Sequence, residues 1–254
     1  MRFPIFAARL ALTALLLAAL IAALAVVSVR AGLAAFGTGL EAMTAAVVLE
    51  LIALALALVW MVSALKHNRG EAKRIGMTAL LGSLVLLYVP LHTVYQGLMA
   101  PLIHDATTDP DDPPTFVALA KRPPGANSTV FDAKEQISYR GEHNTVSYML
   151  HEYYSGLTHP LALIMPPGKM FWRCFNTAKR MGWNIVDYNE KEGRIEATAA
   201  SFWFGQVSDI VIRVRPAGAL GARFDMRAES ENGKRDFGRN IGLLKDYRAA
   251  LNSL

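Results

Sequence analysis

The chain lacks most of the features that would mark an enzyme or a disulfide-bonded protein. Cys174 is its only cysteine, so no intrachain disulfide can form. It contains no HExxH, GxSxG, GxxxxGK[ST] or GxGxxG motif, the patterns of zinc proteases, α/β-hydrolases, P-loop proteins and dinucleotide-binding proteins. Cys174 lies on the apolar side of a predicted helix, where a buried, inert thiol is expected. These absences favour a non-enzymatic protein without a cofactor.

Acidic residues are scarce in the first part of the chain. Residues 1–100 carry seven basic and three acidic side chains, whereas residues 101–254 carry 19 and 18. The sequence pI of about 9.4 therefore comes mainly from the first part. Since the second part is almost balanced, its charge gives no reason to expect a nucleic acid partner.

Three long apolar runs fill residues 1–100, at about 7–29, 42–65 and 75–95. Each approaches the roughly 20 apolar residues that a helix needs to cross a bilayer. Buried helices of a soluble protein are the alternative, but here three such runs follow one another with only short links. The runs therefore predict three transmembrane helices, with the lipid bilayer as a partner.

Basic residues in the short loops predict the orientation. The loop after the second run contains Lys66, Arg69, Lys73 and Arg74. Short loops rich in lysine and arginine stay in the cytoplasm, and the N-terminus with Arg2 and Arg9 follows the same rule. Three spans then place the rest of the chain in the periplasm, if this is an inner (plasma) membrane protein of a Gram-negative bacterium. A signal peptide is the alternative for the first run, which is longer than a usual apolar core of that kind.

One carboxylate falls well inside a predicted span. Glu50 on the second run and His92 on the third lie at similar depths, so they are a candidate intramembrane polar pair. One interpretation is a polar clamp between helices. The other is a proton or ligand site, which would make the chain a small transport or proton-coupled accessory protein.

Residues 101–128 are rich in proline and aspartate and predict an extended strap between the membrane helices and a domain. His104, Asp105 and Asp109 are the candidate metal ligands in it, and they would support a metal-assisted hydrolase. The strap has no glycine at a tight turn and no glutamate at loop spacing, and its prolines favour a structural role.

Residues 129–254 predict a periplasmic α+β domain. A helix opens at Pro166-Pro167-Gly168, and a second runs from Asp236, its predicted N-cap, to about Leu251. The predicted strands are 183–188, 194–199, 209–215 and 222–230. The expected fold is an antiparallel sheet of about four strands with two helices packed on one face. For residues 129–165, only a short aromatic helix near Tyr148–Tyr154 is predicted.

The last three strands alternate between an apolar and a charged face. On the charged face, the arginines are interpreted either as a salt-bridge lattice in solvent or as ligands for phosphate headgroups. The candidate binding residues of the domain are Arg213, Arg215, Arg227, Asp209, Arg235 and Asp236.

Five segments resemble the domain of unknown function 1499 family. They are Ile103–Pro114, Met181–Trp183, Gly193–Ala199, Asp209–Arg215 and Arg235–Asn240. The resemblance covers most of residues 101–254, and the three-span front end is similar to that of many bacterial members. It implies an envelope location and a shared fold. It implies no catalytic residue, because the family has no established activity. Gly205–Asp209 departs from the family by lacking a second acid and an aromatic residue.

These observations favour a non-enzymatic inner-membrane protein whose periplasmic domain binds an envelope lipid or a protein partner. The metal-assisted hydrolase and the small transport protein are the alternatives.

Overall fold

The computed structural model describes residues 3–64, 70–101, 103–159, 161–233 and 236–253. They form two compact units. The first, termed the membrane unit, runs to Tyr95 and includes Trp203–Gly205. The second, termed the domain, comprises Gln96–Phe202 and the chain from Gln206 onward.

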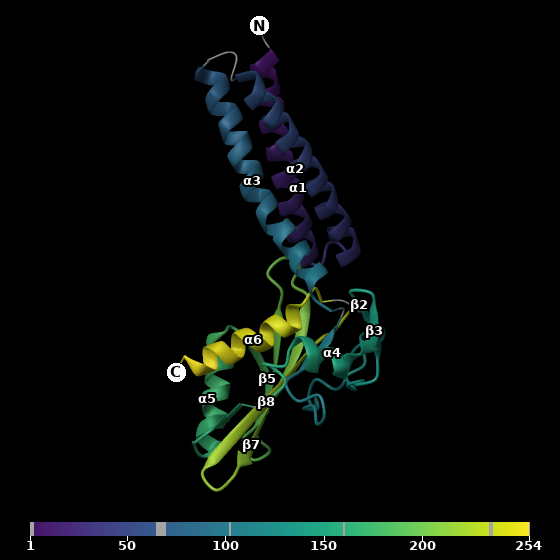
Figure 1. The fold of residues 1–254 in the computed structure, drawn as a ribbon, viewed down its shortest axis with the longest axis vertical. Coiled ribbons are helices and arrows are strands. Elements are labelled where there is room, and N and C mark those ends of the chain that lie inside the picture. The colour runs from purple at the N-terminus through teal and green to yellow at the C-terminus, as the bar shows by residue number, and fades with distance from the viewer. Residues whose placement is uncertain (1–2, 65–69, 102, 160, 234–235, 254) are drawn as a thin grey trace. The chain divides into compact units, whose positions relative to one another are not determined.

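The membrane unit contains the long helices α1 (Phe3–Arg30), α2 (Phe36–Ala64) and α3 (Gly70–Met99) (Figure 1). Each includes a segment long and apolar enough to cross a membrane: Pro4–Arg30, Phe36–Ser63 and Ala72–Tyr95. The prediction of three membrane-spanning helices is confirmed at this level. The last turn of α3, from Gln96, belongs to the domain.

Small residues let the three helices approach one another. Ala11, Ala57 and Ala79, one from each helix, form a fully buried layer. Gly76 on α3 lies directly against the Trp60 ring of α2, where any Cβ atom would overlap the indole. Because lipid tails are as apolar as the side chains, close packing of this kind replaces the hydrophobic effect as the source of helix association.

The domain is built on a six-stranded antiparallel sheet in the order β1-β8-β7-β6-β5, with β4 also paired to β8. Its strands are β1 (Asp105–Thr107), β4 (Leu161–Leu163), β5 (Asn184–Asn189), β6 (Arg194–Ala200), β7 (Val207–Ala217) and β8 (Gly221–Ser230). The α+β prediction is confirmed, but the expectation of about four strands is wrong. The additional strands β1 and β4 have three residues each, which is too short to show an alternating pattern.

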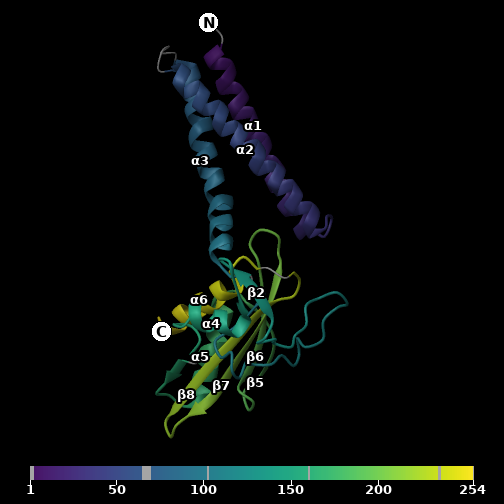
Figure 2. The ribbon, with the colours of Figure 1, turned by 45° about the vertical axis from the view of Figure 1, so that its right-hand side comes forward.

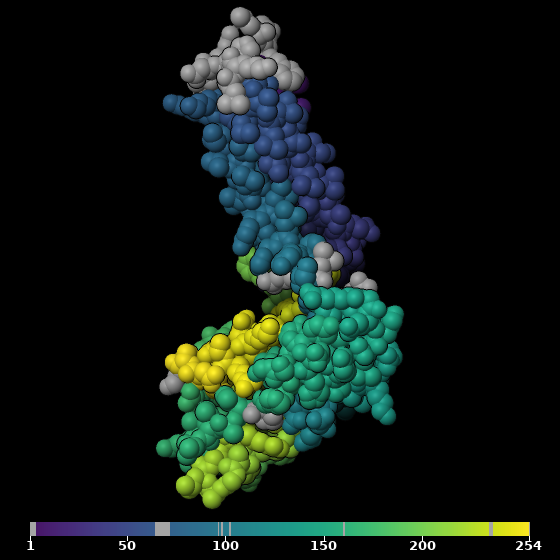
Figure 3. All heavy atoms as spheres, viewed as in Figure 1, coloured from purple at the N-terminus to yellow at the C-terminus, as the bar shows by residue number. Residues whose placement is uncertain are grey.

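A separate hairpin joins β2 (Gln136–Tyr139) and β3 (Glu142–Thr145), and α4 (Val146–Tyr153) follows it. This helix matches the short aromatic helix expected there. Thr145 caps α4, because its hydroxyl accepts a hydrogen bond from the Tyr148 N–H at 3.2 Å. In Figure 3, the segment around α4 (teal) lies beside α6 (yellow) on one face of the domain.

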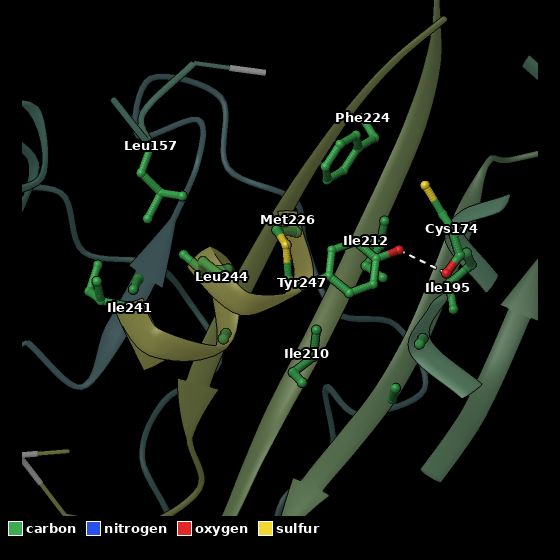
Figure 4. Packing of buried hydrophobic residues seen from close by; sticks show 14 of the residues in the cluster. Leu157, Cys174, Ile195, Ile210, Ile212, Phe224, Met226, Ile241, Leu244 and Tyr247 are labelled. Atoms are coloured by element: carbon green, nitrogen blue, oxygen red, sulfur yellow. Dashed lines mark hydrogen bonds between the residues drawn. The ribbon is translucent and has the colours of Figure 1, made fainter. Parts of the chain in front are cut away.

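The helices α5 (Pro167–Arg180) and α6 (Arg239–Asn252) pack on the apolar side of the sheet. Figure 4 shows the core, where Tyr247 of α6 donates a hydrogen bond to the Cys174 carbonyl of α5 at 2.8 Å. Cys174 is fully buried, and burial raises the pKa of its thiol to about 12, so the thiol is inert at neutral pH.

Candidate functional site: a charged layer under the strap and an acidic cleft

Three carboxylates lie side by side across three neighbouring strands. Asp105 of β1 pairs in register with Glu229 of β8, and Glu229 pairs with Asp209 of β7. All three residues are buried. Like charges directly opposite one another destabilise a sheet, so this acid row requires compensating cations.

Two arginines supply the compensation. Arg227 on β8, which is 1% exposed, binds Asp105 through Nε at 2.8 Å and Nη2 at 2.7 Å. Arg122, from the strap, binds both Nε and Nη2 to Asp209, at 2.9 and 2.7 Å. Both arginines also donate to Glu229, at 3.2 and 3.0 Å. Paired two-pronged contacts of this kind are the strong form of the arginine–carboxylate bond.

Three carboxylates therefore share two guanidinium groups. The pKa of Glu229 is raised to about 7, first by burial and second by the neighbouring Asp105, and the two arginines only partly offset this. The acid row thus holds a proton at near-neutral pH, with Glu229 as its central member.

The strap covers this charged layer, and Figure 2 shows its backbone on the side of the sheet away from α5 and α6. The backbone N–H groups of Val117, Ala118 and Leu119 all donate to the Glu196 carboxylate of β6, at 2.9, 3.2 and 2.8 Å. Arg194 pairs with the same carboxylate. Glu196 is fully buried, so the strap replaces the water that a charged sheet face would otherwise bind.

The outer end of the charged layer is more accessible. Arg213 and Arg215 both reach Asp112 of the strap and Asp225 of β8, at distances of 2.6 to 3.3 Å. Asp109 lies 3.8 and 3.5 Å from the same two arginines. The arginine side chains keep 20% and 29% of their surface exposed.

The candidate binding residues are thus largely engaged within the domain. Arg213, Arg215 and Arg227 all pair with acids, and Asp209 is held by Arg122. The expected salt-bridge lattice exists, but the strap buries its inner half, so the expectation that it lies in solvent is wrong there. Arg235 lies outside the described residues.

Asp236 has a structural position rather than the predicted N-cap position. The helix α6 begins at Arg239, so Gly238 is its N-cap, with a left-handed φ of 78°. The Asp236 carboxylate accepts hydrogen bonds from the backbone N–H groups of Gly238 and Asn240, at 2.8 and 2.6 Å. Burial nevertheless raises its pKa to about 6.

An acidic cleft of about 170 Å³ opens beside β1. Its polar lining residues are His104, Asp105, Ser128, Asp132 and Glu135. The His104 Nδ1 atom lies 3.8 Å from Glu135 Oε2. As far as the described residues go, the lining contains no lysine or arginine.

The three predicted metal ligands do not converge. His104 and Asp105 line the cleft, with Asp105 bound to Arg227, whereas Asp109 faces Arg213 and Arg215. Within the described part of the chain, no group of three or more histidine, cysteine, aspartate or glutamate side chains could hold a metal ion.

Residues 105–251 match the family described as "Protein of unknown function (DUF1499)". The chain belongs to this family. The match begins at the first residue of β1 and ends in α6. The DUF1499 region therefore contains the sheet, the charged layer and the strap from Asp105 onward. No curated protein matches the chain.

Within the DUF1499 region, sequence reasoning missed Arg122 as a member of the buried network, and it placed Glu196 and Glu229 on a charged face without predicting that they are buried. The alternation of β6 and β8 does place both glutamates on the charged face. Arg122 gave no local signal, because its partner Asp209 is 87 residues away.

Outside the DUF1499 region, the two intramembrane candidates are placed differently from each other. Glu50 is 3% exposed and its carboxylate oxygens make no hydrogen bond within the described residues, with the buried Ser83 of α3 as its polar neighbour. His92 is exposed and stacks on Tyr88, with ring centroids 5.6 Å apart. The predicted polar pair of Glu50 and His92 is therefore not joined by a hydrogen bond from the Glu50 carboxylate within the described residues.

Proposed function

We propose that this DUF1499 protein is a non-enzymatic, membrane-anchored binding protein, with its domain in the periplasm and its three spans in the inner membrane. The basic residues between the second and third spans support this orientation. The domain binds an envelope lipid or protein partner through an amino group that enters the acidic cleft.

The observation that carries this proposal is the charge of the cleft. Arg227 neutralises Asp105, but Asp132 and Glu135 also line the cleft, and its described lining has no lysine or arginine. Carboxylates that share a small hollow favour a cationic guest, which forms charge-assisted hydrogen bonds with them.

The size of the cleft limits the guest. At about 170 Å³ it is smaller than the roughly 300–1,000 Å³ of pockets that enclose drug-sized ligands. An ethanolamine headgroup or a lysine side chain fits this scale, and an acyl chain would have to remain outside. The shared chemistry of both guests is a primary ammonium group.

The cleft is proposed as the binding site in place of the charged layer because the charged side chains of that layer already pair with one another. The acid row and the arginines of the charged layer bind one another, so an incoming phosphate would have to displace Asp112 or Asp225 from Arg213 and Arg215. Asp225 is fully buried, and leaving it without its arginines would be costly, which makes the arginines a weaker ligand site than the cleft.

Native mass spectrometry of the full chain tests the proposal. The protein is released from bilayers that contain phosphatidylethanolamine, and the mass of any retained lipid is measured. The wild-type protein should retain this lipid, and Glu135→Gln should lose it. Glu152→Gln, an exposed acid on α4, is the matched control and should retain the lipid.

Carbodiimide crosslinking distinguishes the two sources of the amino group. This reagent joins a carboxylate to an amine in direct contact, so a protein partner should be joined at Glu135 or Asp132. Absence of both a retained amino lipid and a crosslink at these residues would overturn the proposal.

A further inference from the structure

The charges of the acid row do not balance. Within the described residues, its three carboxylates pair with two guanidinium groups, those of Arg122 and Arg227. Each of the three acids is at most 5% exposed, so water screens the remaining negative charge poorly. The row therefore needs one further positive charge, which can be a proton or a cation from outside the protein.

Asp105 links the acid row to the acidic cleft. It lines the cleft, and it pairs in register with Glu229 of the neighbouring strand. The Nη2 atom of Arg227 donates to both carboxylates, at 2.7 Å to Asp105 and 3.2 Å to Glu229. When Glu229 carries a proton, Arg227 compensates Asp105 more fully. When Glu229 loses that proton, it shares Arg227 with Asp105, and the cleft beside Asp105 becomes more negative.

We infer that the ammonium group of the guest and a proton on Glu229 are alternative counter-charges for the acid row, so that the cleft binds its guest in exchange for that proton. This exchange rests on the proposed function, because it requires a cationic guest in the cleft. The cleft is small, so a bound ammonium group lies close to Asp105. The proton leaves the Glu229 carboxyl group for the solvent, and the net charge of the site does not change.

The titration of Glu229 falls in the range where such an exchange responds to pH. The pKa of Glu229 is raised to about 7, by burial first and by Asp105 second. Coupling between two ligands is reciprocal, so a guest that displaces the proton binds more tightly once the proton is gone. If the two exclude each other, Kd at pH 6 should be about tenfold higher than at pH 8. The domain would thus hold its guest at neutral pH and release it in acid.

Other groups near the cleft also take up protons. His104 lines the cleft and becomes positively charged when it is protonated. Burial raises the pKa of Asp236 to about 6, and Asp236 interacts with the charge of His104. The other acids that face the cleft or the row are Asp132, Glu135 and Glu196. Protonation of any of these groups would also weaken the binding of a cation, so the released proton has to be assigned to a residue.

Isothermal titration calorimetry of the full chain in detergent tests the exchange. The probe is Nα-acetyl-lysine amide, whose side-chain ammonium group stays charged between pH 6 and 8. Titrations at pH 7 in two buffers with different enthalpies of ionisation give the number of protons released. We expect about half a proton for each probe bound, because Glu229 is about half protonated at this pH. Nα-acetyl-norleucine amide, which lacks the amine, is the control ligand and should release none.

Glu229→Gln assigns the proton. The row of this variant has two carboxylates and two guanidinium groups, so it needs no further positive charge. Its Kd for the probe should be the same at pH 6 and pH 8, and close to the wild-type value at pH 6. Glu152→Gln, an exposed acid on α4, is the matched control and should keep the wild-type profile. Proton release that persists in Glu229→Gln would come from another group, such as His104 or Asp236, and would overturn the inference.

The wild-type titrations alone separate this exchange from the proposed function. Binding of the probe without proton release, and with the same Kd at pH 6 and pH 8, would overturn the exchange and leave the ammonium site standing. Absence of binding at pH 8, where the cleft is most negative, would overturn the ammonium site and the exchange together. Neither outcome depends on a variant, so misfolding of Glu229→Gln would not prevent the test.

Discussion

The membrane unit and the domain bury polar groups in opposite ways. In the membrane unit, Glu50 is buried and its carboxylate makes no hydrogen bond within the described residues. In the domain, Asp105, Asp209 and Glu229 are buried as well, yet each is bound to Arg122 or Arg227. The helices pack through contacts between small residues, whereas the domain encloses a charged layer between its sheet and its strap.

This difference shows what each environment permits. A water-soluble domain can fold a polar segment over a charged sheet face, because the strap supplies N–H donors and an arginine in place of water. Membrane helices have no such segment at hand, and an isolated acid in them costs free energy. Removing a charged side chain should therefore lower the free energy of unfolding of the domain and raise that of the membrane unit.

The largest effect is expected from Arg227→Ala. The change leaves Asp105 and Glu229 buried without their shared cation, so the free energy of unfolding should fall by about 3–5 kcal/mol. Arg223→Ala, a partly exposed position on the same strand, is the control and should change it by less than about 1 kcal/mol. Chemical denaturation of the protein in detergent measures both. Equal effects would mean that the buried layer is not an energetic unit.

The acid row predicts a pH dependence. The folded domain binds a proton at Glu229 up to about pH 7, whereas the unfolded chain releases it near the ordinary pKa of 4.5. The folded state therefore binds more protons in this window, and stability should decrease as the pH rises from 4.5 to 7, by at most about 3 kcal/mol.

Glu229→Gln provides the comparison for this titration. Glutamine cannot release a proton, so the variant should show a flatter profile of unfolding free energy between pH 4.5 and 7. A wild-type profile that rises with pH across the window would show that the arginines keep Glu229 ionised throughout.

A smaller effect is expected at Gly76 in the membrane unit. Gly76→Ala introduces a methyl group into the space of the Trp60 ring, and overpacking of this kind costs about 1–3 kcal/mol. Gly37→Ala on α2 is the control, since nothing lies within 4 Å of its Cβ position. Thermal unfolding of the helices in detergent, followed by circular dichroism, compares the two. If both variants melt alike, the Trp60 contact does not hold α3.

The smallest effect has the opposite sign. Glu50→Leu removes an unpaired buried carboxyl group, so it should raise the stability of the membrane unit by about 1 kcal/mol. Glu41→Leu, an exposed acid on the same helix, is the control and should have no such effect. Destabilisation by Glu50→Leu would mean that Glu50 has a stabilising partner, and the contrast between the two regions would fail.

Much of the fold could be predicted because its signals are local. The three spans follow from run length, and the faces of β6, β7 and β8 follow from strict alternation. The apolar residues predicted for the inner face of these strands, such as Ile195, Ile212 and Met226, lie in the core as expected. The helix α5 follows from apolar residues at helical spacing, with Gly182 in the left-handed conformation after its end.

The candidate site could be predicted only in part. The charged face and its arginines are recognisable in the sequence, and His104 and Asp105 are recognisable as candidate site residues. The residues that pair with them are not. Nothing local indicates that the strap folds back so that Arg122 meets Glu229, 107 residues later. The short strands β1 and β4 became strands only because β8 offered them a free edge.

The sequence by itself determined the elements whose pattern is periodic: the membrane helices, the alternating strands and the two long helices on the apolar face. Only the tertiary structure decided that the charged face is buried, that three acids share two arginines, and that an acidic cleft opens beside β1. The physical reason is the distance along the chain between the residues that interact. Periodicity reflects contacts between residues two to four positions apart, whereas a buried ion network depends on which distant segment closes over it, and that choice depends on the packing of the whole domain.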